Sequence, residues 1–254
     1  MASDLIDKSA RNKADVECLT WNVHRCRGQD GIIDPIRTEN VILELVKDGE
    51  PDLLVLTEAD AEQPPYGALL DLDEIVEKTS MRHAQAEGTL RWGKQSSGFL
   101  GTVVLYADRF ELVHGALLDL PGHYPRGATI LTFRHQALLF SVIATHLSLT
   151  QALRIVQMRT IGQYLNRQPS MPAILIGDLN EWRPWNGLAF SERVVGHEFR
   201  GPSSQSFPSH RPFLPLDRVM ATAPARVSNT RAIFSERVRK TSDHLPVRAT
   251  VSLL

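Results

Sequence analysis

Polar side chains suited to metal and phosphate chemistry follow the apolar segments of this 254-residue sequence. At seven places they supply four carboxylates, two amides and two imidazoles: Asn22, Glu58, His146, Asp178, Asn180, Asp217 and the pair Asp243-His244. Any one of these residues alone is commonly a solvated cap at the end of a strand. Together they provide hard oxygen ligands that suit Mg²⁺ or Mn²⁺. The sequence lacks the Cys/His ligand spacing of a structural zinc site.

Two of these places carry further spacing information. Asp178 and Asn180 are two residues apart, so both side chains point to one side if the chain stays extended. Gly177, directly before them, permits a close approach of another backbone segment. His244 needs a carboxylate partner to hold its tautomer and to stabilise the imidazolium, and Asp217 is a candidate for that partner.

The elements that must position these residues are mostly strands. Alternating or continuous apolar patterns predict strands over residues 17–23, 52–56, 102–106, 111–118, 129–133, 137–145, 173–176, 216–220, 226–229 and 247–254. Helical spacing predicts helices over residues 37–47 and 150–165, the second capped by Thr150. Residues 200–215, rich in Ser and Pro, are predicted to form an irregular loop. Strands that are apolar on both faces need cover on both sides, so we predict an α/β sandwich of two facing sheets with helices outside.

The composition is that of an ordinary globular protein, with 43% hydrophobic and 22% charged residues. The net charge is 28 − 29 = −1, yet residues 121–254 carry 16 basic and 7 acidic side chains, an excess of nine that is nearly all arginine. Arginine suits bidentate phosphate contacts. The two cysteines, Cys18 and Cys26, fit a reduced compartment. Disorder, collagen and a disulfide scaffold are excluded.

The N-terminal segment has no apolar core of a signal peptide, and no apolar run approaches the roughly 20 residues of a membrane span. We therefore expect a cytoplasmic monomer without a transmembrane segment, and leave contact with a membrane surface open. Residues 1–14 are expected to form a flexible extension, and residues 15–254 a single domain.

The ordered set of motifs resembles one known superfamily. In sequence order the motifs are LTWNVH, LLVLTEAD, YPRGATI, ATHLSL, ILIGDLNEW, LDRV and TSDHLPV. Their order and spacing over residues 17–254 are similar to those of the endonuclease/exonuclease/phosphatase superfamily. The resemblance implies a four-layer α/β/β/α sandwich, with two mixed, mainly antiparallel sheets and the active site at one edge.

The resemblance also implies a role for each residue of the set. Glu58 matches the main Mg²⁺ ligand, Asn22 the amide beside the metal, and Asp243 an outer or second-metal ligand. Mn²⁺ is an alternative to Mg²⁺.

The remaining matched residues concern the phosphate and the attacking water. Asp178 matches the aspartate that orients or deprotonates the water, and Asn180 holds the phosphate or that aspartate. The other implied roles are those of His146 and His244 flanking the scissile phosphate, Asp217 as partner of His244, and Arg126 near the phosphate. Arg218 departs from the family pattern, because His or Tyr is common after the aspartate.

The predicted function is Mg²⁺-dependent hydrolysis of a phosphoester by in-line attack of water. The first expectation for the substrate is a phosphodiester, as in a nuclease, and nucleic acid is the corresponding partner. The alternatives are a lipid phosphodiesterase of the sphingomyelinase type and a phosphomonoesterase. The remaining hypothesis is a non-catalytic binding scaffold, against which the retained site residues argue.

Overall fold

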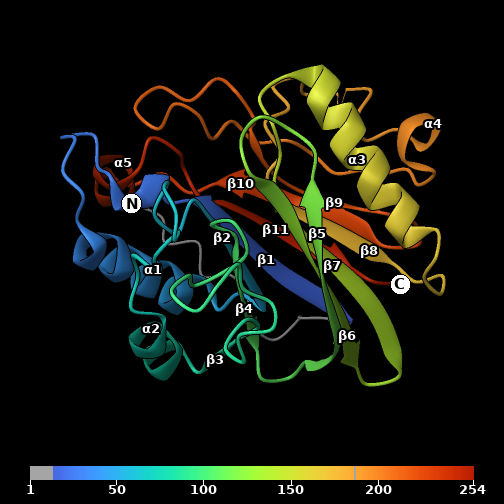
Figure 1. Cartoon of the computed structure of the whole chain (residues 1–254), viewed down its shortest axis with the longest axis horizontal. Helices are drawn as coiled ribbons and strands as arrows, with labels where there is room; N and C mark the ends of the chain where they lie inside the picture. The colour runs from blue at the N-terminus through green and yellow to red at the C-terminus, as the bar shows by residue number, and fades with distance from the viewer. Residues whose placement is uncertain (1–13, 186) are drawn as a thin grey trace.

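Two β-sheets packed face to face form the centre of the molecule in the computed structural model, which describes residues 14–185 and 187–254 (Figure 1). Within these residues, the six-stranded sheet has the order β10 (Arg226–Ala232), β11 (Val247–Ser252), β1 (Asp15–Asn22), β2 (Leu53–Thr57), β4 (Val103–Ala107) and β3 (Met81–His83). The five-stranded sheet has the order β5 (Glu111–Leu120), β6 (Arg126–His135), β7 (Leu138–His146), β8 (Ala173–Asp178) and β9 (Asp217–Ala221). Residues 1–13 of the predicted N-terminal extension lie outside the described residues.

Helices form the two outer layers, on opposite sides in Figure 1. The six-stranded sheet is covered by α1 (Pro35–Gly49), α2 (Leu72–Thr79) and α5 (Glu236–Thr241), which share one buried apolar cluster with it. The five-stranded sheet is covered by α3 (Gln151–Leu165) and α4 (Glu192–Val195), which share another. The predicted four-layer sandwich is therefore confirmed.

The apolar pattern of β2 shows why a central strand of this fold is buried on both faces. Leu53 and Val55 belong to the cluster between the sheets, whereas Leu54 and Leu56 belong to the cluster beneath α1 and α2. Successive side chains of a strand point to opposite faces, so a strand between two apolar layers has a continuous apolar run.

Strand direction brings the polar strand ends to one edge. β1 and β2 are parallel, with Asn22 opposite Thr57, and β7 and β8 are parallel, with His146 opposite Asp178. β9 runs antiparallel to β8 and places Asp217 opposite Asp178. Parallel neighbours end at the same edge, so residues distant in the sequence become neighbours there.

The two predicted helices are present with slightly different bounds. α1 begins after Asp34, whose side chain accepts a hydrogen bond from the Arg37 backbone N–H, and ends before Glu50, which has a φ of 43°. Thr150 is the residue before α3, but its side chain makes no capping hydrogen bond. Residues 200–215 are irregular, as predicted. Among the described residues, no helix is both long and apolar enough to cross a membrane.

The α-helices and strands absent from the sequence prediction are α2, β3, α4 and α5, none longer than eight residues. Each buries two or fewer hydrophobic side chains, so the apolar pattern over these segments is too short to specify an element.

Candidate active site

The predicted site residues gather where the two sheets meet at one edge. Asn22 ends β1, His146 ends β7, Asp178 ends β8 and Asp217 begins β9, while Glu58 directly follows β2. The side chains at the four strand positions are buried, and Glu58 is 13% exposed. The sheets thus enclose a polar cluster whose members come from positions spread over more than half of the chain.

Asp178 lies at the centre of this cluster. Its Oδ2 accepts a hydrogen bond from Asn22 Nδ2 at 3.0 Å, and lies 3.3 Å from His146 Nε2 and 4.0 Å from His244 Nε2. Its Oδ1 accepts a hydrogen bond from the Asn180 backbone N–H at 3.1 Å. The carboxylate is therefore held in orientation by two hydrogen bonds, one to each oxygen, with two imidazoles close to Oδ2.

The conditional prediction for Asp178 and Asn180 is corrected by the structure. The chain does not stay extended, because Asn180 has a φ of 51° in the left-handed region. The Asn180 side chain instead donates from Nδ2 to the Leu147 carbonyl at 2.8 Å, while its backbone N–H reaches Asp178. Gly177 does permit the expected close approach, since a side chain at this position would place its Cβ only 2.0 Å from the Thr145 carbonyl oxygen.

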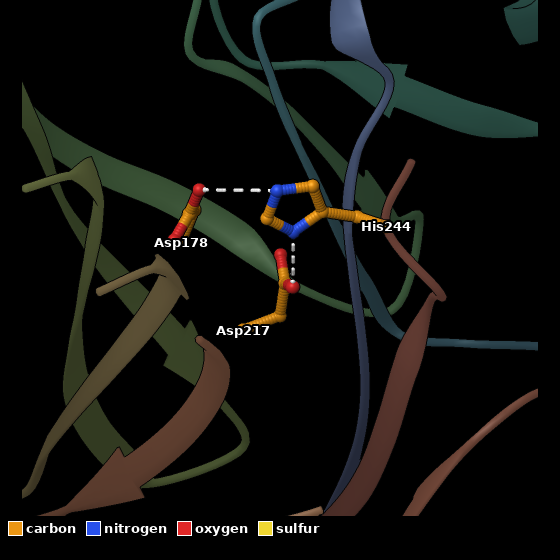
Figure 2. Close-up of side chains that lie close together, drawn as sticks. All are labelled: Asp178, Asp217 and His244. Carbon is orange, nitrogen blue, oxygen red and sulfur yellow. Dashed lines mark hydrogen bonds and ion pairs between the residues drawn. The ribbon is translucent and has the colours of Figure 1, made fainter. Parts of the chain in front are cut away.

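His244 and Asp217 form a buried pair, shown in Figure 2 beside Asp178. The His244 Nδ1 lies 2.7 Å from Asp217 Oδ2, and Ser206 Oγ donates to the same oxygen at 2.6 Å. The indole N–H of Trp21 donates to the His244 carbonyl at 2.9 Å, and the ring of Phe207 packs on the imidazole at 4.8 Å between centroids. The predicted partnership of Asp217 and His244 is present in the geometry.

The pKa values of the two site histidines are shifted in opposite directions from the ordinary value of 6.5. Burial lowers the pKa of His244, but the attraction and hydrogen bond of Asp217, with Asp178 and Asp243 nearby, raise the pKa overall to about 10. Burial lowers the pKa of His146 to about 3 despite the nearby Asp178 carboxylate. His244 is therefore a cation near neutral pH, whereas His146 is neutral.

Glu58 and Asn22 are the residues predicted to hold a metal ion, and the Asn22 Oδ1 accepts a hydrogen bond from the His24 backbone N–H at 2.9 Å. They lie one residue apart across the parallel pair of β1 and β2. Glu58 has a φ of 55°, a left-handed conformation that turns the chain sharply after β2. Its Oε2 accepts from Arg25 NH1 at 2.5 Å, and its Oε1 lies 3.9 Å from His146 Nδ1, beyond hydrogen-bond distance. Carboxylate and amide oxygens of this kind fit Mg²⁺ or Mn²⁺.

A second group of possible ligands fits a metal less well. Atoms of Asp178, Asp217 and His244 lie within 4.8 Å of one another. Asp217 Oδ2 and His244 Nδ1 are engaged with each other at 2.7 Å, so neither of these two atoms is free to bind a cation while the pair is intact. This hydrogen-bonded pair is better suited to holding a proton on His244 than to coordinating a metal ion.

Asp243 lies further out than Glu58. Its side chain is 35% exposed, and its Oδ1 lies 3.5 Å from His24 Nδ1. Within the described residues, that oxygen is buried and has no hydrogen-bond partner. The structure places Asp243 beside His24 rather than against Glu58, and its role as a ligand stays a prediction.

Arg126 borders a pocket at the same edge. The pocket has a volume of about 270 Å³, and its lining includes Arg25, Glu58, Arg126 and His146. Burial lowers the pKa of Arg126 below its ordinary value, although the Glu58 and Asp178 carboxylates act to raise it. Among the described residues, the Arg126 Nε has no hydrogen-bond partner. A larger cavity of about 570 Å³ lies near the ends of α1 and α2 and contains none of these residues.

Two contributors to the site were missed by the sequence analysis. Arg25 pairs with Glu58, and Ser206 bonds Asp217. The first contact spans 33 residues and the second spans 11 residues across an irregular loop, and no local pattern marks either residue. A third group, the buried Glu181 with Arg154 and Arg183, supports the turn after β8 through ion pairs of 3.3 and 3.0 Å.

The departure at Arg218 has a structural explanation. Its guanidinium turns away from the pair of Asp217 and His244 and donates to the carbonyls of Pro215 and Glu181, at 2.9 and 2.8 Å. Arg218 thus fixes the segments on either side of the site and leaves Asp217 in its expected contact.

Comparison with known proteins gives matches over most of the chain. The model of the Endonuclease/Exonuclease/phosphatase family matches residues 19–244. The uncharacterized protein YbhP of Escherichia coli strain K12 is 30% identical over 118 residues, which cover 44% of this chain and 46% of YbhP. The match thus spans about half the length of that curated relative.

Solved structures share the fold at low sequence identity. An endonuclease/exonuclease/phosphatase from Beutenbergia cavernae has a TM-score of 0.65 and 22% identity, covering 94% of this chain and 72% of its own. The mannosyl-6-phosphatase of Bacteroides thetaiotaomicron has a TM-score of 0.66 and 15% identity, covering 93% and 99%. The family match, supported by the fold and the clustered site, shows that the chain belongs to the endonuclease/exonuclease/phosphatase family of hydrolases.

Proposed function

We propose that this protein is a divalent-metal-dependent phosphodiesterase that acts by in-line attack of water on phosphorus. The observation that carries the proposal is the environment of Asp178, whose carboxylate is held by Asn22 and Asn180 and faces His146 and His244. A fixed, buried carboxylate of this kind can orient a water molecule and accept its proton.

The attacking water is activated by Asp178 in this mechanism. Because Asn22 Nδ2 and the Asn180 N–H bond the two carboxylate oxygens, the carboxylate cannot rotate away from the water. The neutral His146, with Nε2 3.3 Å from Oδ2, completes the polar wall beside this carboxylate.

Negative charge on the phosphoryl oxygens is stabilised from two directions. His244, kept protonated by Asp217, presents Nε2 toward the region of Asp178. Arg126 contributes a guanidinium from the pocket that Glu58 also lines. Preorganised charges of this type contribute more in a buried site than in water.

The residues that would hold Mg²⁺ or Mn²⁺ are Glu58 and Asn22, with Asp243 as an outer ligand. When bound there, the ion supplies Lewis-acid polarisation of the phosphoryl oxygens. Arg25, which pairs with Glu58, orients that carboxylate by occupying Oε2, while Oε1 faces His146.

The test is hydrolysis of bis-p-nitrophenyl phosphate with Mg²⁺ or Mn²⁺, before and after addition of EDTA. We expect Asp178→Asn to lower kcat by about 10²–10⁴. The matched control is Asp108→Asn, which changes a carboxylate that is 69% exposed and paired with Arg82, and it should keep wild-type activity. A kcat near wild type for folded Asp178→Asn contradicts the mechanism.

A substrate panel separates the remaining alternatives. p-Nitrophenyl phosphate reports a phosphomonoesterase, sphingomyelin a lipid phosphodiesterase, and plasmid DNA and an abasic duplex report nucleases. Absence of metal-dependent turnover on every substrate, together with absence of metal binding, favours the non-catalytic scaffold.

A further inference from the structure

The pocket beside Glu58 has an apolar side that the proposed chemistry does not use. Besides the charged residues, its lining includes Tyr66, Leu100, Tyr124 and Leu149. Tyr124 is 72% exposed and Leu149 74% exposed, although both lie next to a buried catalytic cluster. Large apolar side chains left open beside a reacting centre are typical of a surface that binds part of a ligand.

The two loops that carry these side chains are held together by a buried glutamine. Gln157 of α3 donates from Nε2 to the Pro121 carbonyl at 2.9 Å and to Ser148 Oγ at 2.8 Å. Its Oε1 accepts from the Ser148 backbone N–H at 2.9 Å. Gln157 thus fixes the loop before Tyr124 against the loop before Leu149.

A buried arginine fixes the second loop further. Arg154 NH1 donates to the carbonyl of Ser148 at 3.1 Å and to that of Leu149 at 2.5 Å. Both Arg154 and Gln157 are fully buried. The exposed side chains therefore stand on a backbone that is anchored from below, which reduces the entropy lost when a ligand binds.

The charges around the pocket suit one phosphate and a neutral group. Asp60 is buried and accepts from the backbone N–H groups of Ser97 and Gly98, at 2.8 and 3.2 Å, so it supports the wall rather than a ligand. Arg25 is paired with Glu58 and lies 3.9 Å from Glu62. Within the described lining, Arg126 is the cation that carries no ion pair. The carboxylates disfavour a second anionic group here.

We propose that this pocket is a subsite for an uncharged aromatic ring carried by the ester group of the substrate. The ring packs against Tyr124 and Leu149 while the attached phosphate reaches Arg126, on the side of the pocket where Glu58 would hold the metal ion. A volume of about 270 Å³ suits a compact ring system rather than a long acyl chain. The inference rests on the proposed function and specifies the substrate for the same site.

The test compares binding of phenylphosphonate and methylphosphonate by calorimetry in the presence of Mg²⁺, which requires no turnover. We expect phenylphosphonate to bind about five- to tenfold more tightly, as expected for one aromatic contact. Tyr124→Ala and, separately, Leu149→Ala should reduce this ratio to about twofold or less. Phe234→Ala, which truncates an aromatic side chain that is 60% exposed and outside the pocket, should retain it.

The outcomes separate the two proposals. Equal affinities for the two phosphonates in the wild type, or an unchanged ratio in both folded pocket variants, overturn the subsite while leaving hydrolysis of bis-p-nitrophenyl phosphate to stand. A phenyl preference that depends on Tyr124, in a protein that hydrolyses no phosphoester, supports the subsite and overturns the proposed activity.

Discussion

Replacing Asp217 by Asn removes the charge that keeps His244 protonated. Asp217 is fully buried, and its Oδ2 accepts hydrogen bonds from His244 Nδ1 and from Ser206 Oγ. Its other oxygen has no hydrogen-bond partner among the described residues, so the amide nitrogen of Asn at that position becomes an unsatisfied donor. That group alone costs roughly 1–3 kcal/mol of folding free energy, and the loss of a charged acceptor adds to it.

The effect on catalysis follows from the pKa of His244. With Asp217 the pKa is about 10, although burial acts to lower it. Without the carboxylate, burial dominates and the pKa falls, so the imidazole is neutral at pH 7.5 and no longer stabilises charge on phosphate. We expect kcat to fall by about 10²–10⁴. The milder Ser206→Ala leaves the carboxylate and should cost about tenfold or less.

The pH dependence of stability gives an independent readout. Because the folded-state pKa of His244 lies above its ordinary value of 6.5, the pair stabilises the fold fully below pH 6.5, and this contribution is lost as the pH rises toward 10. Urea denaturation should show a decline over that window in the wild type and a weaker decline in Asp217→Asn. Titration of the His244 ring by NMR measures the pKa directly. An unchanged His244 pKa in the variant would refute the reasoning.

Two further predictions concern the backbone and the thiols. Gly177→Ala should lower the free energy of unfolding by about 3 kcal/mol in urea, because Gly177 has a φ of 140° and the added Cβ meets the Thr145 carbonyl. Gly67→Ala, where no atom lies within 4 Å of the added Cβ, is the control and should be near neutral. Cys18 and Cys26 are fully buried, and burial raises both pKa values, that of Cys26 to about 11. Both should resist Ellman's reagent at pH 8 until the protein unfolds, and rapid reaction of the native protein contradicts this.

The layers of the fold follow from local sequence patterns. Runs such as residues 53–56 are apolar at every position, which requires cover on both faces and leads to facing sheets with outer helices. α2 illustrates the limit, because its eight residues bury only Leu72 and Ile75. Such a short amphipathic pattern is stabilised mainly by packing against α1 and β3, and that packing is not local information.

The site was predictable as a set of residue types, but not as a set of contacts. Asn22, Asp178 and His244 were identified because each is polar at the end of an apolar strand. That Asn22 bonds Asp178 across 156 residues depends on the docking of the two sheets. The pairing of Arg25 with Glu58 depends on left-handed φ angles at both residues, which their side chains do not favour and tertiary structure must impose.

The pairing of β1 with β11 has a consequence for synthesis on the ribosome. Trp21 bonds His244 across 223 residues, and the register from Asp15 opposite Ser252 to Thr20 opposite Val247 joins an early strand to a late one. At about 5–20 residues per second, the ribosome takes roughly 10–45 s to produce the segment that separates them. During that interval one edge of β1 lacks its final partner and is exposed to mispairing or to chaperones. Because Asp243 and His244 lie within four residues of the start of β11, a nascent chain carries an incomplete active centre until this late segment emerges.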